Sequence, residues 1–222
     1  MAQRLAARHL IVLAAALLCA STPARADGPG AYRSRLIDTG TPATPQGAID
    51  AYTAGYASIL RAEHAENLVA ASSSDADRAA ARKEANRAYV TALESFATAV
   101  RLDASMHEAH TYMGYGNRKL GRYEPALQAY ERALQLEPDQ PRAIQYQGEA
   151  FLGLNRPDQA RFNYLRLYAL DKPQADKLLL AMHSWVESKR SKPPTGVDFD
   201  AFAGWVAERV AATQVDTTRA RW

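Results

Sequence analysis

The strongest constraint on the fold of this chain is an internal repeat, in which the sequence matches itself at an offset of 34. Residues 109–114, Ala-His-Thr-Tyr-Met-Gly, align with residues 143–148, Ala-Ile-Gln-Tyr-Gln-Gly. The same offset aligns three more pairs: Ala126 with Ala160, Tyr130 with Tyr164, and Leu136 with Leu170. Applied once more toward the N-terminus, it leads to Ala92, Phe96 and Leu102. A unit of this length cannot bury its apolar side alone, so consecutive copies are expected to stack into an array.

Each unit is expected to be a pair of antiparallel helices. No stretch shows the alternation of apolar and polar residues that is typical of strands, and helix-forming residues, alanine above all, dominate from residue 48 onward. Four small residues at the aligned positions would let two helices approach closely: Gly114, Gly148, Ala126 and Ala160. Tyr130 and Tyr164 would fill the space between one unit and the next. Pro138 and Pro173 are expected to end the second helix of each unit, because proline has no amide hydrogen to donate.

Residues 107–140 resemble a tetratricopeptide repeat. The resemblance is carried by seven residues: Gly114, Gly121, Tyr123, Ala126, Tyr130, Ala133 and Pro138. Met113 replaces the usual leucine, His110 the first aromatic residue and Asn117 the later tyrosine. Residues 141–174 match through Gly148, Phe151, Ala160, Tyr164 and a displaced Pro173, and residues 89–103 match only the second half of a repeat. The resemblance implies an all-α fold, a short helical solenoid of about three helix-turn-helix repeats with C-terminal capping helices.

Residues 48–106 are expected to form an N-terminal helical hairpin, equivalent to a degenerate repeat. Its first helix, 48–71, has five large apolar or aromatic residues mainly on one face: Tyr52, Tyr56, Ile59, Leu60 and Leu68. The second helix, 76–102, contains no Gly or Pro, and Asp75 is expected to be its N-cap. A turn near residues 86–89 that divides this second helix in two is the alternative.

Residues 175–212 are expected to cap the last repeat with two helices. The first, 175–190, carries apolar residues at helical spacing: Leu178, Leu179, Met182, Trp185 and Val186. After a linker at 191–196, the second helix, 198–212, carries Phe199, Phe202, Trp205, Val206 and Val210 on one side. Such a cap is needed because the last repeat otherwise exposes its apolar edge. The tail, 213–222, is expected to fray.

Residues 1–26 have the pattern of a bacterial export signal. Arg4 and Arg8 precede an apolar run at 10–20, which is too short to span a bilayer, and residues 24–26, Ala-Arg-Ala, form a cleavage site. Cleavage after Ala26 would deliver the protein to the periplasm or the medium, with a flexible Gly- and Pro-rich leader at 27–47 and no segment that inserts into a membrane. One alternative is a lipoprotein anchored at Cys19, although Leu18 is larger than the residue that such signals place there. A short buried helix of a cytosolic protein is another.

Removal of this segment changes the charge of the protein. The whole chain has 27 basic and 24 acidic residues, and the segment takes away Arg4, Arg8 and Arg25 but no acid, so 24 of each remain. The basic surplus on which nucleic-acid binding would depend is then gone. The only cysteine, Cys19, leaves with the segment, so neither a disulfide nor a thiolate site is expected afterwards.

The resemblance to tetratricopeptide repeats implies that the first helices of the repeats line a concave surface for a protein or peptide partner of the cell envelope. By their position in the repeat, nine residues would lie on that surface: Glu108, Thr111, Tyr115, Arg118, Lys119, Arg142, Gln145, Glu149 and Leu152. They form a mixed polar rim with an aromatic anchor. The residues do not specify a partner, a pathway or an oligomeric state.

A catalytic or metal site has little support in the sequence. No nucleophile motif and no phosphate-binding loop occur, so an enzyme is not predicted, and an envelope hydrolase remains only a third hypothesis. No cofactor is expected. His107 and His110 stand three positions apart and could reach one metal ion from a helix, but no further ligand follows from the spacing. A periplasmic protein that binds a metal or a small ligand at these histidines is therefore the alternative function.

Overall fold

The computed structural model describes residues 46–213, and within them the chain forms eight helices and no strand. The helices are α3 (Gln46–Ala71), α4 (Asp75–Leu102), α5 (His107–Lys119), α6 (Tyr123–Leu136), α7 (Pro141–Gly153), α8 (Pro157–Leu170), α9 (Lys172–Lys189) and α10 (Phe199–Thr213). The all-α prediction is confirmed. The export signal, the leader up to residue 45 and the tail from residue 214 lie outside the described residues.

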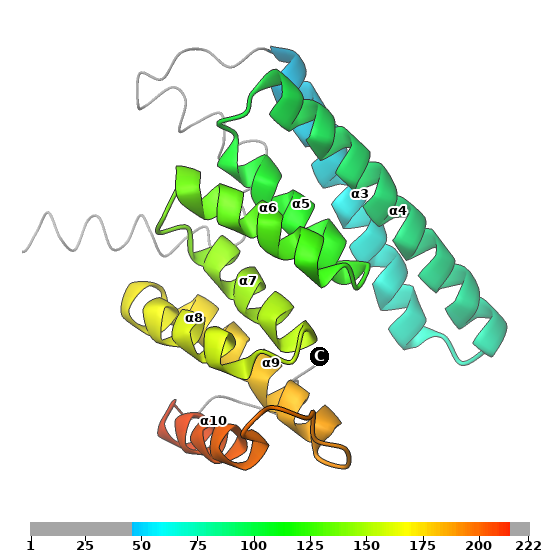
Figure 1. Cartoon of the computed structure of the whole chain (residues 1–222). Coiled ribbons are helices and arrows are strands. Elements are labelled where there is room, and N and C mark those ends of the chain that lie inside the picture. The colour runs from blue at the N-terminus through cyan, green and yellow to red at the C-terminus, as the bar shows by residue number, and fades with distance from the viewer. Residues whose placement is uncertain (1–45, 214–222) are drawn as a thin grey trace, which may run out of the picture. The chain divides into compact units, whose positions relative to one another are not determined.

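The helices pack as a series of hairpins (Figure 1). α3 pairs with α4, α5 with α6, and α7 with α8, and each hairpin contacts the next. α5 also contacts α3 and α7, and α9 packs on both α7 and α8 before α10 covers α9. The first helices of successive hairpins are therefore neighbours. This is the arrangement of a tetratricopeptide-like solenoid, as the internal repeat of the sequence predicted.

Glycine permits the closest approaches between helices. A Cβ atom added to Gly114 would lie 2.3 Å from Cε1 of Tyr130, so α5 and α6 could not keep their present separation with a larger residue there. Gly55 of α3 has the same relation to Phe96 of α4, at 2.7 Å. At Gly148 the partner differs from the prediction, because the nearest side chain is Leu178 of α9, at 2.6 Å, and not a residue of α8. The cap is thus packed into the last repeat.

The turns inside the second and third hairpins share one backbone feature. Gly121 has φ +73°, and Asn155, its equivalent in the next repeat, has φ +55°. Both values lie in the left-handed region, which glycine adopts freely and asparagine tolerates better than most residues. Each turn reverses the chain over a short segment, which places the two helices of a hairpin side by side.

The first hairpin differs from the later ones in length. α4 is a single helix from Asp75 to Leu102, so it has no turn at residues 86–89. Its N-cap is Ser74, whose hydroxyl accepts a hydrogen bond from the amide of Asp77 at 3.4 Å, and the assignment of Asp75 to this role was wrong. α3 starts at Gln46, slightly earlier than predicted.

The buried face of α3 also departs from the prediction. Tyr52 and Ile59 are buried, but Leu60 and Leu68 are about half exposed. Small residues are buried instead: Ala48, Gly55, Ser58, Ala62 and Ala65. The reason is the close packing of α3 against α4, which leaves room for small side chains at the interface and directs the two leucines to the surface.

The C-terminal helices close the array. α8 ends at Leu170 and α9 begins at Lys172, so Pro173 lies in the first turn of α9 and does not end α8 as expected. Trp185 of α9 is fully buried against Phe199 and Phe202 of α10. α10 extends from residue 199 to Thr213, and a carboxylate oxygen of Asp198 accepts the amide of Ala201 at 3.2 Å just before it.

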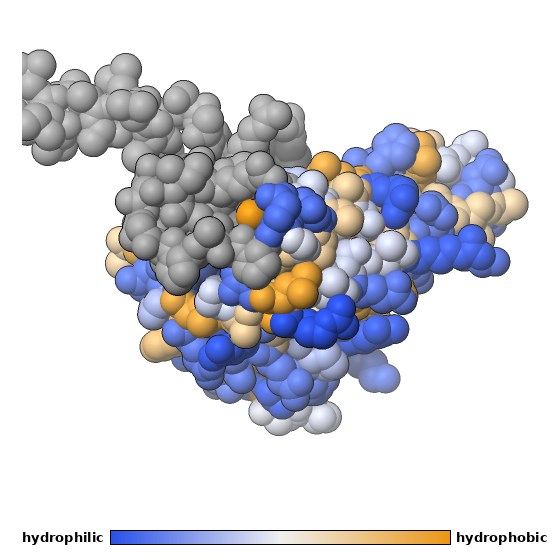
Figure 2. Space-filling view, turned by 90° about the horizontal axis from the view of Figure 1, so that it is seen from above, coloured by the Kyte–Doolittle hydropathy of each residue, from blue (hydrophilic) through white to orange (hydrophobic). Residues whose placement is uncertain are grey.

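The surface of the described chain is mainly polar. In the view of Figure 2, apolar residues form small separate groups among hydrophilic ones. Among the large apolar side chains of the described residues, Phe162 of α8 has the highest exposed fraction, 68 %. No helix within residues 46–213 has both the length and the apolar character that crossing a bilayer requires.

Candidate functional site

The candidate site is the side of the molecule formed by α3, α5 and α7, which we call the inner face. The three helices run in the same direction. The rings of Tyr56 and Tyr112 are 5.3 Å apart in the N-terminal halves of α3 and α5, and Glu66 meets Lys119 in their C-terminal parts. α5 and α7 are related in the same way, because Tyr112 lies near Arg142 and Arg118 near Glu149. The contacting residues of α5 and α7 are 30 and 31 positions apart, so each lies about one helical turn from the equivalent position of its partner's repeat.

Two polar contacts join α3 to α5. The hydroxyl of Tyr115 donates a hydrogen bond to Oε1 of Glu63 at 2.8 Å. One helical turn further along, Nζ of Lys119 lies 2.7 Å from Oε2 of Glu66, in an ion pair that is about one quarter to one third exposed. These contacts determine how the long first hairpin is positioned against the first regular repeat.

A more buried ion pair joins α5 to α7. The guanidinium of Arg118 lies 2.7 Å from Oε2 of Glu149, and the two side chains are 16 % and 14 % exposed. Its Cζ atom also lies 5.2 Å from the ring centre of Tyr115 and 5.4 Å from that of Tyr146. The cation is thus held between two aromatic rings and a carboxylate, an arrangement that restricts its side-chain rotamer. Nε2 of Gln145 donates to the other carboxylate oxygen of Glu149 at 2.6 Å.

The same two helices are connected again nearer their N-termini. Arg142 of α7 donates to the hydroxyl of Tyr112 of α5 at 3.1 Å. The hydroxyl of Thr111 donates to Oε1 of Gln140, the residue that caps α7, at 2.6 Å. We refer to the six residues Glu63, Glu66, Tyr115, Arg118, Lys119 and Glu149 as the inner-face polar row.

Burial determines the protonation of the tyrosines beside this row. It raises the pKa of Tyr115 well above its usual value, with smaller contributions in the same direction from nearby Tyr89 and Glu63. Burial likewise raises the pKa of Tyr146 to about 12, and Arg142 opposes this effect. Both phenols are therefore neutral at physiological pH and can act as hydrogen-bond donors. Burial lowers the pKa of Arg118, but Glu149 and the neighbouring tyrosines together raise it by more, so the pKa stays above its ordinary value and the guanidinium stays charged.

Of the nine residues predicted for the concave surface, seven belong to the contacts just described: Thr111, Tyr115, Arg118, Lys119, Arg142, Gln145 and Glu149. Glu108, Thr111 and Leu152 are fully buried, so they do not contribute to an exposed rim. Leu152 belongs to the core that α7 shares with α8, α9 and α10. The repeat pattern alone could not reveal this, because the core that contains Leu152 includes the capping helices, which are not repeats.

The two candidate metal ligands lie in different surroundings. Nε2 of His107 is 3.3 Å from Oε1 of Glu108, at the start of α5. Burial lowers the pKa of His110, a hydrogen bond with the backbone of Ala104 opposes this shift, and nearby Arg132 of α6 adds to it. Among the described residues there is no group of three or more His, Cys, Asp or Glu side chains placed to hold a metal ion.

Three important residues of this face were missing from the prediction. Glu63 and Glu66 belong to α3, where no match to the repeat sets the register against α5. Tyr146 was recognised only as a repeated residue, paired with Tyr112 by the repeat offset. Its ring lies 5.0 Å from that of Tyr115, so it forms part of the aromatic surface around Arg118.

Part of the chain matches a known protein family. Residues 107–140, which are α5, α6 and the segment up to the cap of α7, match the family model described as Tetratricopeptide repeat. These are the boundaries of the first complete repeat in the sequence. A comparison with curated proteins gave no match.

Proposed function

The chain belongs to the tetratricopeptide repeat family, and from this premise we propose that it is a non-catalytic scaffold that binds a partner protein, or a peptide segment of one, on its inner face. Proteins of this family generally bind other proteins and are not enzymes. The partner would lie along α3, α5 and α7, where the sequence places a mixture of charged and aromatic residues.

The observation that supports this proposal is the pre-ordered state of the inner-face polar row. Glu63, Glu66 and Glu149 each have a partner on the neighbouring helix, so the row is held in one arrangement across three hairpins. Side chains that are already ordered lose less conformational entropy when a partner binds than mobile ones do. Tyrosine and arginine are also the residues that most often dominate the energy of protein interfaces.

We further propose that this scaffold acts in the bacterial cell envelope, as the export pattern of residues 1–26 indicates. The test is expression with a C-terminal tag, cell fractionation and N-terminal sequencing. A mature chain that begins at Asp27 in the periplasmic fraction supports export. An acylated chain that begins at Cys19 supports the lipoprotein alternative, and an intact chain in the cytoplasm contradicts both.

Photo-crosslinking in living cells tests the inner face. A photoreactive phenylalanine analogue replaces Tyr56 of α3 or Lys119 of α5, and in the control it replaces Glu131, which is exposed on α6. We expect the same partner to be captured from both inner-face positions and not from the control position. Equal capture from all three positions, or capture from Glu131 alone, would show that the partner binds elsewhere.

A charge exchange distinguishes an effect on partner binding at the inner face from an effect on folding. The double variant Glu66→Lys with Lys119→Glu keeps the internal ion pair between α3 and α5 but inverts both charges. We expect it to retain the helix content and the unfolding midpoint of the parent and to capture the partner at least tenfold less efficiently. Unchanged capture would exclude this pair from the binding surface.

A further inference from the structure

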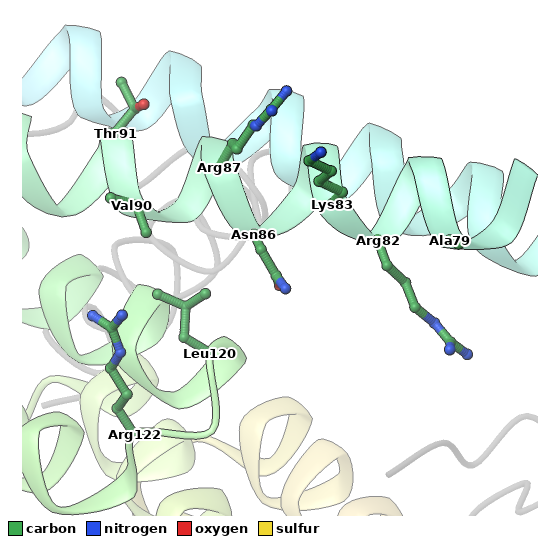
Figure 3. Close-up of a pocket in the computed structure, with 9 residues that line it drawn as sticks. All are labelled: Ala79, Arg82, Lys83, Asn86, Arg87, Val90, Thr91, Leu120 and Arg122. Carbon is green, nitrogen blue, oxygen red and sulfur yellow. The ribbon is translucent and has the colours of Figure 1, made fainter. Parts of the chain in front are cut away.

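A second surface lies outside the inner face, between α4 and the turn that joins α5 to α6. It is an open hollow of about 1050 Å³. Its lining comes from the exposed side of α4 and from both sides of the turn (Figure 3): Ala79, Arg82, Lys83, Asn86, Arg87, Val90, Thr91, Leu120 and Arg122. We call it the α4 groove.

Four of the nine lining residues are cations, and none is an acid. Arg82, Lys83, Arg87 and Arg122 have no ion pair or side-chain hydrogen bond within residues 46–213, in contrast to Arg118 and Lys119 on the inner face. Of the acids of α4, Asp75 is paired with Arg78, and Glu94 lies one turn beyond Val90. Glu84 lies within the stretch, next to Lys83, but it does not line the hollow. The lining of the groove is therefore positively charged.

The cations lie on both sides of a small apolar centre. Val90 is 38 % exposed and lies opposite the half-buried Leu120. In Figure 3, Arg82, Asn86 and Val90 point from α4 toward the side on which Leu120 and Arg122 lie, whereas Lys83 and Arg87 project from the other side of α4. One wall thus presents a cation, an amide and an apolar side chain on successive turns.

We propose that the α4 groove binds an acidic peptide segment of a partner protein in extended conformation. Arg82, Asn86 and Val90 recur at every fourth position, so they are spaced by about 6 Å along the helix. Side chains on one face of an extended peptide repeat every ~6.7 Å, which is nearly the same interval. A peptide of the pattern Glu-x-x-x-Leu-x-Glu can therefore direct its leucine to Val90 and Leu120, its first carboxylate two intervals away to Arg82, and its second carboxylate to Arg122. Asn86 can pair with the peptide backbone.

An acidic peptide fits this groove better than an anionic membrane does. A bilayer is locally flat, and the cations that bind it project from a convex or flat surface, whereas Arg82 and Arg122 come from opposite walls of a hollow. Charge complementarity of this kind accelerates association and selects the partner more than it adds to the final affinity. The site is independent of the inner face, since no residue of the inner-face polar row lines it.

The probe for the experiment is a fluorescein-labelled peptide with two copies of Glu-Ser-Ser-Ser-Leu-Ser-Glu, and its control is the same peptide with Gln in place of Glu. Binding to the full chain is followed by fluorescence anisotropy. We expect the acidic peptide to bind, its affinity to fall steeply as salt is raised from 50 to 300 mM, about a sixfold change, and the Gln peptide to bind at least tenfold more weakly.

The decisive variant is Arg82→Glu with Arg122→Glu, and the chain offers a matched control in Arg156→Glu with Lys177→Glu. Arg156 is the equivalent of Arg122 in the next repeat, and each is the N-cap residue of the helix that follows, so both variants make the same change in net charge and in one helix cap. The groove variant should weaken peptide binding at least tenfold, and the control variant less than twofold.

Several results would overturn this proposal. Equal weakening by both double variants would mean that only net charge matters, and equal binding of the Gln peptide would exclude charge recognition. Binding of phosphatidylglycerol vesicles that the groove variant abolishes, without peptide binding by the parent, would assign the surface to a membrane. Circular dichroism verifies that each variant is folded, and Arg82→Gln with Arg122→Gln replaces the charge reversal if that variant is not.

Discussion

Gly114 is the residue whose size most directly limits the spacing of two helices. A Cβ atom at this position would overlap the ring of Tyr130, which is fully buried and cannot move away freely. We predict that Gly114→Ala lowers the free energy of unfolding by about 1–3 kcal/mol, the usual effect of overpacking a core.

The matched control is Gly204→Ala in α10, where nothing lies within 4 Å of the added methyl group. There the helix propensity of alanine should stabilise the protein by up to ~1 kcal/mol. Urea unfolding measures both, and equal effects would contradict the packing argument.

The charged side chain of Arg118 holds α5 against α7 through its ion pair with Glu149. Arg118→Ala leaves the carboxylate of Glu149 with one fewer partner between α5 and α7, and we expect a loss of about 2–4 kcal/mol, somewhat below that of a fully buried pair. Lys119→Ala removes the more exposed pair with Glu66 and should cost no more than ~1 kcal/mol. The double variant Arg118→Met with Glu149→Leu should recover most of the stability. A double variant less stable than Arg118→Ala alone would refute this account.

His110 should make stability depend on pH. Because burial lowers its pKa below the ordinary value of 6.5, the folded state binds a proton more weakly than the unfolded chain. Stability is therefore fully present above about pH 6.5 and falls as the pH decreases through the lowered pKa. We expect His110→Phe to reduce the difference between urea midpoints at pH 7.5 and pH 5.0. His64→Gln, at an exposed histidine, is the control for loss of an imidazole, and an unchanged difference in His110→Phe would show that other groups cause it.

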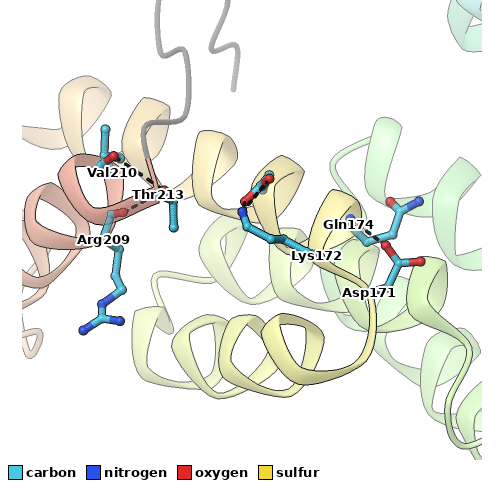
Figure 4. A network of polar contacts seen from close by, with 7 residues as sticks. Asp171, Lys172, Gln174, Arg209, Val210 and Thr213 are labelled. Carbon is cyan, nitrogen blue, oxygen red and sulfur yellow. Dashed lines mark hydrogen bonds and ion pairs between the residues drawn. The ribbon is translucent and has the colours of Figure 1, made fainter.

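At the scale of a helix, caps and turns determine where each element begins. The boundary between α8 and α9 depends on Asp171, whose carboxylate accepts the amide of Gln174 at 3.0 Å (Figure 4). We predict that Asp171→Ala lowers the free energy of unfolding by about 1 kcal/mol, the typical effect of losing an N-cap, and that Asp171→Ser restores most of it. Thermal unfolding followed by circular dichroism measures the change.

The neighbouring residue is the control for that experiment. Lys172 forms an exposed ion pair with Asp176 at 2.8 Å, one turn along the same helix. Since solvent screens such a pair, Lys172→Ala should change the unfolding midpoint much less than Asp171→Ala does. Equal effects from the two substitutions would mean that charge and not the cap stabilises this junction.

At the scale of the whole array, each hairpin contacts mainly its neighbours. A destabilising substitution should therefore affect its own hairpin and the adjacent ones more than distant helices. Phe202→Ala removes a buried ring that packs on Trp185, and we expect a loss of about 3–5 kcal/mol in the C-terminal part of the array. Hydrogen exchange followed by mass spectrometry should show faster exchange in α9 and α10, with α3 and α4 nearly unchanged. Uniformly faster exchange in all helices would instead indicate a single cooperative unit.

Much of this architecture could be predicted because it depends on local and periodic features. The repeat offset predicted the hairpins, and the small residues at 114 and 126 predicted close helix packing. The left-handed residue at 121 lies in the turn expected there. The boundaries of α3, α9 and α10 differed slightly from those expected, because caps such as Asp171 depend on single hydrogen bonds that a pattern of apolar residues does not encode.

The sequence by itself determined that this protein is an array of helical hairpins with an inner side, since the repeat period and residue sizes already dictate both. Only the tertiary structure decided which side chains on that inner side are exposed and unpaired, and so available to contact a partner. Leu152 is buried in the core that α7 shares with α8, α9 and α10, and Arg118 is paired with Glu149. Glu63 and Glu66 reach α5 from a hairpin that has no repeat register. The α4 groove likewise joins Arg82 to Arg122, which are far apart in the sequence. Such contacts depend on the distance between helices, which results from packing of the whole array and is not encoded at any one position.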